Sequence, residues 1–276
     1  MTAALPIHED ELKSMREMRV KMTDTGVKPF KVAVVISPGF IPMDMVGIQT
    51  VLGTCPGAEL HLVWKKRELV EGFPNWWTMP TTTFEECPDD LDVLAAPMMP
   101  PEVISDPDVV DFFHNRGVKA RYIIGVCCGV LLAGAAGLVR GKRVTASYNA
   151  LSVLSELGPS EVLPPGSGVV VDGNLYTAGP GIGSFEASLL VAADAFGQQM
   201  AAFAELAMEY DPHPPFGTGN ASKAHRDSLA MLEALESHMV PLYRSGTTAA
   251  LARVAKFDLP SAVKESQLYG ETSNAI

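Results

Sequence analysis

Two adjacent cysteines, Cys127 and Cys128, stand where a predicted strand meets a predicted helix. Residues 122–126 are mostly β-branched or aromatic and predict a buried strand, whereas small apolar residues from Gly129 onward predict a tightly packed helix. No residues remain for a loop, so the chain must turn abruptly at the cysteines. A thiol on such a turn stands clear of the sheet and faces the amino-terminal end of a helix, which favours the thiolate. The pattern predicts a cysteine nucleophile, with Cys127 as the displayed residue.

Asp44 is the candidate partner of this cysteine. Residues 30–36 predict a strand and residues 42–52 a helix, which places Asp44 in the first turn of the helix, just beyond the strand. Ligand sites in open α/β sheets form at this edge, where the carboxyl ends of the strands lie. A carboxylate at a helix start also interacts favourably with the helix dipole. Position alone favours that structural role of Asp44 over a chemical one.

The remaining pattern predicts the elements that position these two residues. Strands are expected over 58–64 and 91–96, a helix over 108–116, a return to the sheet over 141–148, and a helix over 150–157. A hairpin is expected over 169–177, followed by helices over 184–196 and 200–208. This order predicts a mostly parallel sheet covered on both faces.

Two segments leave alternatives open. Residues 65–83 predict either a short hairpin with Trp76 and Trp77 near a pocket or, as the favoured alternative, ordinary packing at the sheet edge. The glycine-rich residues 178–183 predict a tight connection, since a phosphate-binding loop would need a lysine and a fuller spacing.

Both ends of the chain extend the predicted core. Residues 1–28 are polar and charged and are expected to lie outside it, residues 29–220 form the α/β domain, and residues 221–276 form a helical tail. Apolar residues at helical spacing predict that the tail docks on the core or on a second subunit: Leu229, Leu232, Leu235 and Met239.

Composition excludes several classes of function. The 276 residues include 21 basic and 32 acidic residues, a net charge of −11, which argues against a nucleic-acid surface. No apolar run is long enough for a membrane span, and the amino terminus does not resemble a signal peptide. Four cysteines, two of them adjacent, indicate neither a disulfide framework nor a metal site, so a reducing cytoplasm is the expected setting. No cofactor is expected.

Several widely spaced motifs resemble one family. They are Glu59-Leu-His-Leu-Val-Trp-Lys65, Thr83-Phe-Glu-Glu-Cys-Pro88, Leu91-Asp-Val-Leu94, Val126-Cys127, Ala135-Ala-Gly-Leu138, Val171-Asp-Gly-Asn-Leu175, Glu209-Tyr-Asp-Pro212 and Pro214-Pro-Phe216. In this order they resemble the ThiJ/PfpI superfamily, and within it most of all the isonitrile (isocyanide) hydratases. The resemblance covers residues 30–220.

The resemblance implies a flavodoxin-like α/β sandwich of the class I glutamine-amidotransferase type and a homodimer. It also implies a nucleophile at Cys127 and an acidic partner at Asp44. In such hydratases the thiolate adds to the terminal isonitrile carbon, and the carboxyl group handles protons as water converts the adduct to an N-substituted formamide. This fits the residue types, because a carboxyl facing a sulfur tends to be protonated and can then supply a proton and later activate water.

The chain departs from the family pattern around the same cavity. Cys128 replaces a threonine, Pro97-Met98-Met99 replaces Pro-Gly-Gly, Ser147 replaces a histidine, and Ser184-Phe-Glu186 replaces Gly-Ile-Asp. No other histidine offers a good substitute as general base, so the chemistry would rest on Cys127 and Asp44. The candidate substrate-binding or supporting residues are Cys128, Ser147, Tyr148, Met98, Met99, Gly181, Ile182 and Glu186.

Three hypotheses follow. The first is an isonitrile hydratase, or a relative retuned to a bulkier and more apolar substrate. The second is another cysteine-dependent enzyme, such as a hydrolase, a lyase or a glyoxalase-like enzyme; the missing histidine argues against a peptidase. The third is a non-enzymatic redox sensor or small-molecule-binding protein, in which Cys127 and Cys128 form a disulfide or resolve a sulfenic acid. Packing of Cys128 as a small apolar residue is favoured over that redox role.

Overall fold

A seven-stranded sheet organises the protein, in the order β10-β11-β7-β6-β1-β2-β5. The computed structural model describes residues 12–24 and 26–255. Its neighbouring strands pair in parallel, except that β10 runs antiparallel to β11. The strands of the sheet are β1 (Phe30–Val35), β2 (Ala58–Trp64), β5 (Thr82–Thr83), β6 (Val93–Ala96), β7 (Tyr122–Val126), β10 (Val170–Asp172) and β11 (Leu175–Ala178).

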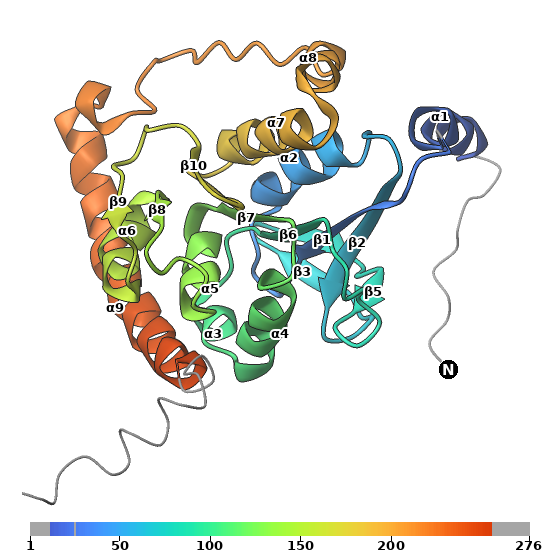
Figure 1. The fold of residues 1–276 in the computed structure, drawn as a ribbon. Coiled ribbons are helices and arrows are strands. Elements are labelled where there is room, and N and C mark those ends of the chain that lie inside the picture. The colour runs from blue at the N-terminus through green and yellow to red at the C-terminus, as the bar shows by residue number, and fades with distance from the viewer. Residues whose placement is uncertain (1–11, 25, 256–276) are drawn as a thin grey trace, which may run out of the picture.

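The central strands are mostly apolar because helices cover both of their faces. Every residue of β6, β7 and β11 is buried. On one face lie α2 (Pro42–Leu52) and α7 (Ile182–Phe196), and on the other lie α4 (Pro107–Gly117) and α5 (Val130–Ala135) (Figure 1). Parallel pairing brings the carboxyl ends of β1, β6, β7 and β11 to one edge, so the connections that follow these strands meet there.

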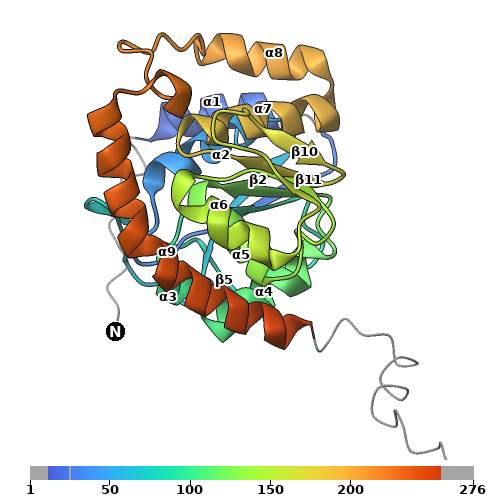
Figure 2. The same ribbon diagram turned by 90° about the vertical axis from the view of Figure 1, so that its left-hand side faces the viewer.

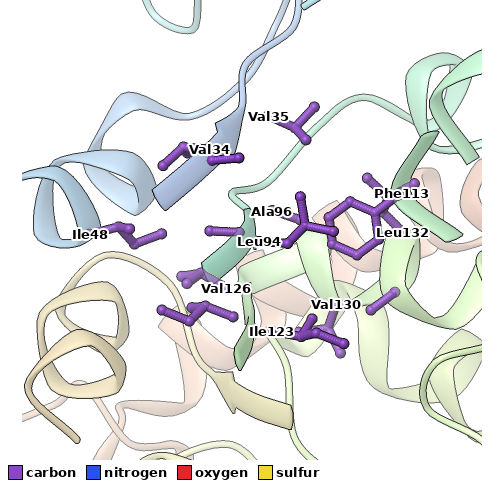
Figure 3. Close-up of a cluster of buried hydrophobic side chains, with 14 of the residues drawn as sticks. Val34, Val35, Ile48, Leu94, Ala96, Phe113, Ile123, Val126, Val130 and Leu132 are labelled. Atoms are coloured by element: carbon purple, nitrogen blue, oxygen red, sulfur yellow. The ribbon is translucent and has the colours of Figure 1, made fainter. Parts of the chain in front are cut away.

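The core fills the space on both sides of the sheet. Figure 3 shows Ile48 of α2 on one side of Val34 and Val126, with Phe113 of α4 and Leu132 of α5 on the opposite side of the strands. All five side chains are fully buried, and burial of an aliphatic or aromatic side chain contributes about 1.5–3 kcal/mol. The core therefore fixes the positions of α2 and of the turn that follows β7.

Helices α2 and α7 approach each other closely through a glycine. A Cβ atom on Gly47 would lie 2.2 Å from Oγ of Ser184 and 2.5 Å from the backbone nitrogen of Phe185. Only glycine fits without displacing backbone. This contact holds the start of α7 against α2.

The remaining elements surround this core. The helices are α1 (Lys13–Thr23), α3 (Pro101–Ile104), α6 (Tyr148–Leu154), α8 (Gln198–Ala207) and α9 (Arg226–Val254), with short 3₁₀ turns η1 (Cys127–Gly129), η2 (Ser155–Leu157) and η3 (Ala221–Lys223). Two small sheets pair β3 (Val70–Gly72) with β4 (Trp76–Thr78) and β8 (Arg143–Val144) with β9 (Glu161–Val162). Among the described residues, no helix is long and apolar enough to cross a membrane.

The structure confirms the predicted flavodoxin-like sandwich and the strands and helices that build it. Residues 65–83 contain a hairpin, β3–β4, and its Trp76 lines a groove, so the less favoured alternative for this segment is the correct one. The expected return of residues 141–148 to the main sheet is wrong. Strand β8 pairs with β9 instead, because β10 already occupies the sheet edge beside β11.

The carboxy-terminal helix also differs from the prediction. It runs to Val254, and its buried residues lie in its second half: Tyr243, Thr247, Ala250 and Val254. Of the predicted contact residues, Met239 packs against the core, whereas Leu235 is 53% exposed. Helix α9 lies along α3, α5 and α6, so the described part of the tail docks on the core, and residues 256–276 lie outside the described part (Figure 2). At the other end, α1 buries none of its residues, and residues 1–11 lie outside the described part.

Candidate active site

Cys127 occupies a strained turn directly after β7. Its φ angle of 58° lies in the left-handed region, which a residue with a side chain enters at a cost of about 1–3 kcal/mol. The following turn needs Gly129, because a Cβ atom there would lie 2.1 Å from the carbonyl oxygen of Ala96. Packing against the end of β6 therefore holds the turn in place, and the Cys127 side chain keeps 9% of its surface exposed.

Asp44 is buried at the start of α2, and backbone donors hold both of its carboxyl oxygens. The N–H of Gly181 donates to Oδ1 at 2.6 Å, and the N–H of Met98 donates to Oδ2 at 3.1 Å. Met98 follows β6 and Gly181 precedes α7, beyond β11. We call this arrangement the carboxyl cradle: Asp44 with the N–H groups of Met98 and Gly181. It is assembled from the connections that follow the carboxyl ends of β1, β6 and β11.

The Asp44 carboxyl also interacts with the Cys127 thiol. Burial raises the pKa of Asp44, against the opposing effect of hydrogen bonds from Gly181, Met98 and Cys127. The carboxyl group therefore stays protonated to a higher pH than an ordinary aspartic acid. This agrees with the expectation of a proton donor beside the sulfur.

The groups around Cys127 act against the expected thiolate. Hydrogen bonding to Cys128, burial and the charge of Asp44 raise the pKa of the Cys127 thiol well above its usual range. A hydrogen bond from Cys127 lowers the pKa of Cys128, with further help from Ser147 and Tyr243. The helix dipole is outweighed because the sulfur is enclosed and faces another acidic group. The two thiols titrate as a pair, with negative charge better accommodated at Cys128.

Ser147 lies beside the second sulfur. Its Oγ atom is 3.2 Å from Sγ of Cys128, and both side chains are buried. Ser147 directly precedes α6, so the end of the β8–α6 connection places it. We call the group formed by Cys127, Cys128, Ser147 and Tyr243 the sulfur cluster. Unlike the carboxyl cradle, it consists of side chains.

The other predicted supporting residues either lie apart from Asp44 and Cys127 or contribute through the backbone and not through their side chains. The Met99 side chain is fully buried in the core, and Met98 contributes to the site through its backbone N–H. The Tyr148 hydroxyl accepts a hydrogen bond from the N–H of Ala221, which ties α6 to the segment before α9. Glu186 accepts a hydrogen bond from Tyr210, on the side of α7 that faces the end of α8.

An apolar groove of about 710 Å³ opens beside the carboxyl cradle. It is lined by residues of α2, the β3–β4 hairpin and α7, among them Met43, Phe73, Trp76, Gly181 and Ile182. Met43 precedes Asp44 in the chain, and Gly181 binds Asp44, so the groove and the carboxyl share the same two connections. The predicted residue Ile182 is 48% exposed on this groove.

Sequence reasoning missed Tyr243. This tyrosine reaches the site from α9, more than a hundred residues after the cysteines. The available signal was the helical spacing of 243, 247, 250 and 254, which marks one buried face. Among the described residues, no three His, Cys, Asp or Glu side chains come together as a metal-binding group.

Comparison with known proteins agrees with this architecture. The model of the DJ-1/PfpI family matches residues 30–191, which include the strands, Asp44 and Cys127. The chain belongs to the DJ-1/PfpI family. It is 32% identical over 233 residues to an isonitrile hydratase from Pseudomonas putida, a match that covers 83% of this chain and 98% of that protein.

Solved structures of this family share the fold. A ThiJ/PfpI family protein from Pseudomonas syringae has a TM-score of 0.76 and 28% identity, over 89% of this chain and 98% of that one. Drosophila melanogaster DJ-1beta has a TM-score of 0.59 and 20% identity, over 66% of this chain and 98% of that one. The difference in coverage shows that the Pseudomonas syringae protein matches more of this chain than DJ-1beta does.

Proposed function

We propose that the protein is a cysteine-dependent hydro-lyase that adds water to an isonitrile and gives an N-substituted formamide. The pairing of Cys127 with Asp44 carries the proposal, since it places a nucleophilic sulfur beside a carboxyl whose pKa is raised by burial. Similarity to an isonitrile hydratase over most of both chains supports the choice of substrate class.

The proposed reaction begins with one proton held between the Cys127 thiol and the Asp44 carboxyl. The sulfur bonds to the terminal carbon of the isonitrile R–N≡C, and the shared proton moves to that carbon. The product of this step is a thioimidate, R–N=CH–S, attached to Cys127, and Asp44 is left as a carboxylate. The fixed N–H groups of Met98 and Gly181 stabilise that carboxylate as it forms.

Water completes the proposed reaction. The water oxygen bonds to the thioimidate carbon, and the Asp44 carboxylate takes a proton from this water and passes it to the nitrogen. Expulsion of the sulfur then releases R–NH–CHO, and the hydroxyl proton returns to the pair formed by Cys127 and Asp44. Asp44 thus acts first as acid and then as base, and no histidine is required.

The apolar groove supports a substrate with a bulky apolar substituent. It opens beside Asp44 and is lined largely by apolar side chains of Met43, Phe73 and Trp76. An isonitrile carries its substituent on nitrogen, away from the reacting carbon, so the substituent would extend from the site into the groove. We therefore propose that aryl or long alkyl isonitriles are better substrates than methyl isonitrile.

We also propose a homodimer in a reducing cytoplasm. Helix α1 buries none of its residues within the chain, and Met15 and Met18 are exposed on it, which supports a second copy as the surface that covers α1. All four cysteines are free. Light scattering after size exclusion should give twice the chain mass, and a single chain mass would refute the dimer.

Isonitrile turnover tests the proposed function directly. The protein is incubated with an aryl isonitrile, and formamide is quantified for the wild type, Cys127→Ala and Cys55→Ala. Cys55 is a matched control, since it is buried away from the site and burial raises its pKa to about 12. Wild type and Cys55→Ala should turn over equally, and Cys127→Ala should not. No turnover by the wild type, or undiminished turnover by Cys127→Ala, would overturn the proposal.

A further inference from the structure

Tyr243 connects the carboxy-terminal helix to the site. It is fully buried in the middle of α9, where the helix lies against α3, α5 and α6 (Figure 2). One turn later, a Cβ atom on Gly246 would lie 2.6 Å from Cβ of Ser105, so the helix approaches α3 as closely as a glycine allows. The burial of Thr247 extends this contact. The position of the Tyr243 side chain is therefore fixed by packing on both sides.

The Tyr243 hydroxyl reaches the turn that holds Asp44. It donates a hydrogen bond of 2.9 Å to the carbonyl oxygen of Met99. The preceding residue, Met98, donates its N–H to Oδ2 of Asp44. One short turn is thus bound at its carbonyl by Tyr243 and at its N–H by Asp44. Displacement of the phenol would loosen one wall of the carboxyl cradle.

The same hydroxyl faces the sulfur of Cys128. Oγ of Ser147 is 3.2 Å from this sulfur, and Cys127 and Tyr243 act with Ser147 to lower the pKa of the thiol, whereas Asp44 is the nearby acidic group. The phenol has one proton, which it donates to the Met99 carbonyl. Burial, together with the charge of Cys128, raises the pKa of Tyr243, and Glu102 adds to the effect.

We infer that Tyr243 is a positioning residue of the active site, whose hydroxyl orients Cys128 beside Cys127 and holds the Met98–Met99 turn that fixes Asp44. The carboxy-terminal helix is therefore part of the catalytic unit. This inference rests on the proposed function for its kinetic consequence. Its structural consequence, the orientation and ionisation of Cys128, is independent of any substrate.

Tyr243→Phe removes only the hydroxyl, and Thr247→Val is its matched control. Thr247 lies one turn further along α9, is equally buried, and donates its hydroxyl to the backbone carbonyl of Tyr243 within the helix. Both variants lose one buried hydroxyl from the same helix. Only Tyr243→Phe loses a contact with the sulfur cluster and with the Met99 carbonyl, so a purely structural role would affect both variants alike.

Two readouts separate this inference from the proposed function. In the Cys127→Ala background, the ultraviolet absorbance of the Cys128 thiolate is followed against pH in the full chain. Tyr243→Phe should shift this titration to higher pH by about one unit, the loss of one hydrogen bond to a charged sulfur, and Thr247→Val should leave it unchanged. For isonitrile hydration, Tyr243→Phe should lower kcat about tenfold with KM nearly constant.

The outcomes are distinguishable. An unshifted thiol titration in Tyr243→Phe, or an equal shift in Thr247→Val, would overturn the inference whether or not the wild type hydrates isonitriles. A shifted titration without isonitrile turnover by the wild type would support the position of Tyr243 and refute the proposed substrate. If Tyr243→Phe does not fold, Cys128→Ala is used instead, because it removes the sulfur that the Tyr243 hydroxyl is inferred to orient. Circular dichroism and kcat of that variant then decide, since unchanged kcat would overturn the inference.

Discussion

The carboxyl cradle and the sulfur cluster meet where Asp44 interacts with Cys127, and they consist of different kinds of groups. Asp44 is held by two backbone N–H groups, those of Met98 and Gly181. The sulfur of Cys128 is surrounded by side chains, those of Ser147 and Tyr243. Backbone donors persist when the side chain of their residue changes, whereas side-chain partners do not. The carboxyl side is therefore set by the fold, and the sulfur side is set by residue identity.

This difference gives different consequences to the departures from the family pattern that the resemblance implies in the two regions. Met98 replaces a glycine of the Pro-Gly-Gly pattern, yet its N–H still binds Asp44. On the sulfur side, the resemblance implies that Cys128 replaces a threonine and Ser147 a histidine, and the side chains of these two residues contact each other. Substitution in the cradle thus changes the shape of the pocket and leaves the acid in place. Substitution in the sulfur cluster changes the ionisation of the nucleophile.

Replacement of the acid itself should have the largest effect within this comparison. Asp44→Asn keeps the size of the side chain but removes the exchangeable proton, so we expect kcat for isonitrile hydration to fall about 10²- to 10⁴-fold. Steady-state kinetics measure the loss, and circular dichroism controls for folding. A loss of less than tenfold would show that another group transfers the proton.

The pH profile of the same pair sharpens this prediction. Burial raises the pKa of Asp44. Hydrogen bonding to Cys128, burial and the charge of Asp44 raise the pKa of Cys127. The active form, in which Asp44 and Cys127 share one proton, is therefore populated between the pKa of Asp44 and the pKa of Cys127. Below this window both groups are protonated, and above it both are ionised. The wild type should give a bell-shaped profile of kcat/KM, and Asp44→Asn a single rise with pH. Two limbs in the variant would contradict the assignment.

Distortion of the cradle should have an intermediate effect. Gly181 has a φ of 62° and donates the shorter hydrogen bond to Asp44, and a Cβ atom there would lie 2.1 Å from Cε of Met43. Gly181→Ala introduces strain of about 1–3 kcal/mol, so we expect kcat to fall about tenfold. Gly179→Ala is the control, because its Cβ atom would meet open space. Equal losses in both variants would refute the role of the N–H group.

Side-chain truncation compares the two regions most directly and should have the smallest effects. Ser147→Ala removes a hydrogen-bond partner of Cys128, worth about 0.5–1.5 kcal/mol, and should lower kcat about two- to tenfold. Met98→Leu retains the N–H and should lower kcat less than Ser147→Ala does. Parallel kinetics on the two variants measure the order. A greater loss in Met98→Leu would reverse the distinction between a backbone cradle and a side-chain cluster.

Local sequence pattern predicted Cys127 as the reacting residue, whereas position alone favoured a structural role for Asp44, and the family resemblance implied its role as the acidic partner. An abrupt strand-to-helix change marks Cys127, and Pro42 at the helix start marks the turn that carries Asp44. Both lie at the carboxyl ends of strands in a parallel sheet, which brings them together once the strand order is known. Their roles in catalysis stay predictions.

The supporting groups were harder to predict, for identifiable physical reasons. The N–H of Met98 acts through the backbone, so the methionine side chain gave no information about it. Tyr243 depends on how α9 docks, and the apolar residues before it, such as Leu235, directed attention to the exposed half of the helix. The raised pKa of Cys127 depends on enclosure by the sulfur cluster, which the strand-to-helix turn does not reveal.

The central claim is that the Cys127 sulfur adds to the isonitrile carbon. Acid quenching during turnover of a slow aryl isonitrile, followed by peptide mass spectrometry, tests it most directly. The account predicts that the peptide with both cysteines gains the mass of one isonitrile, and that fragmentation places it on Cys127. Cys128→Ala should retain this adduct, and Cys127→Ala should lose it. An adduct located on Cys128, or formamide produced by Cys127→Ala at the wild-type rate, would contradict the account.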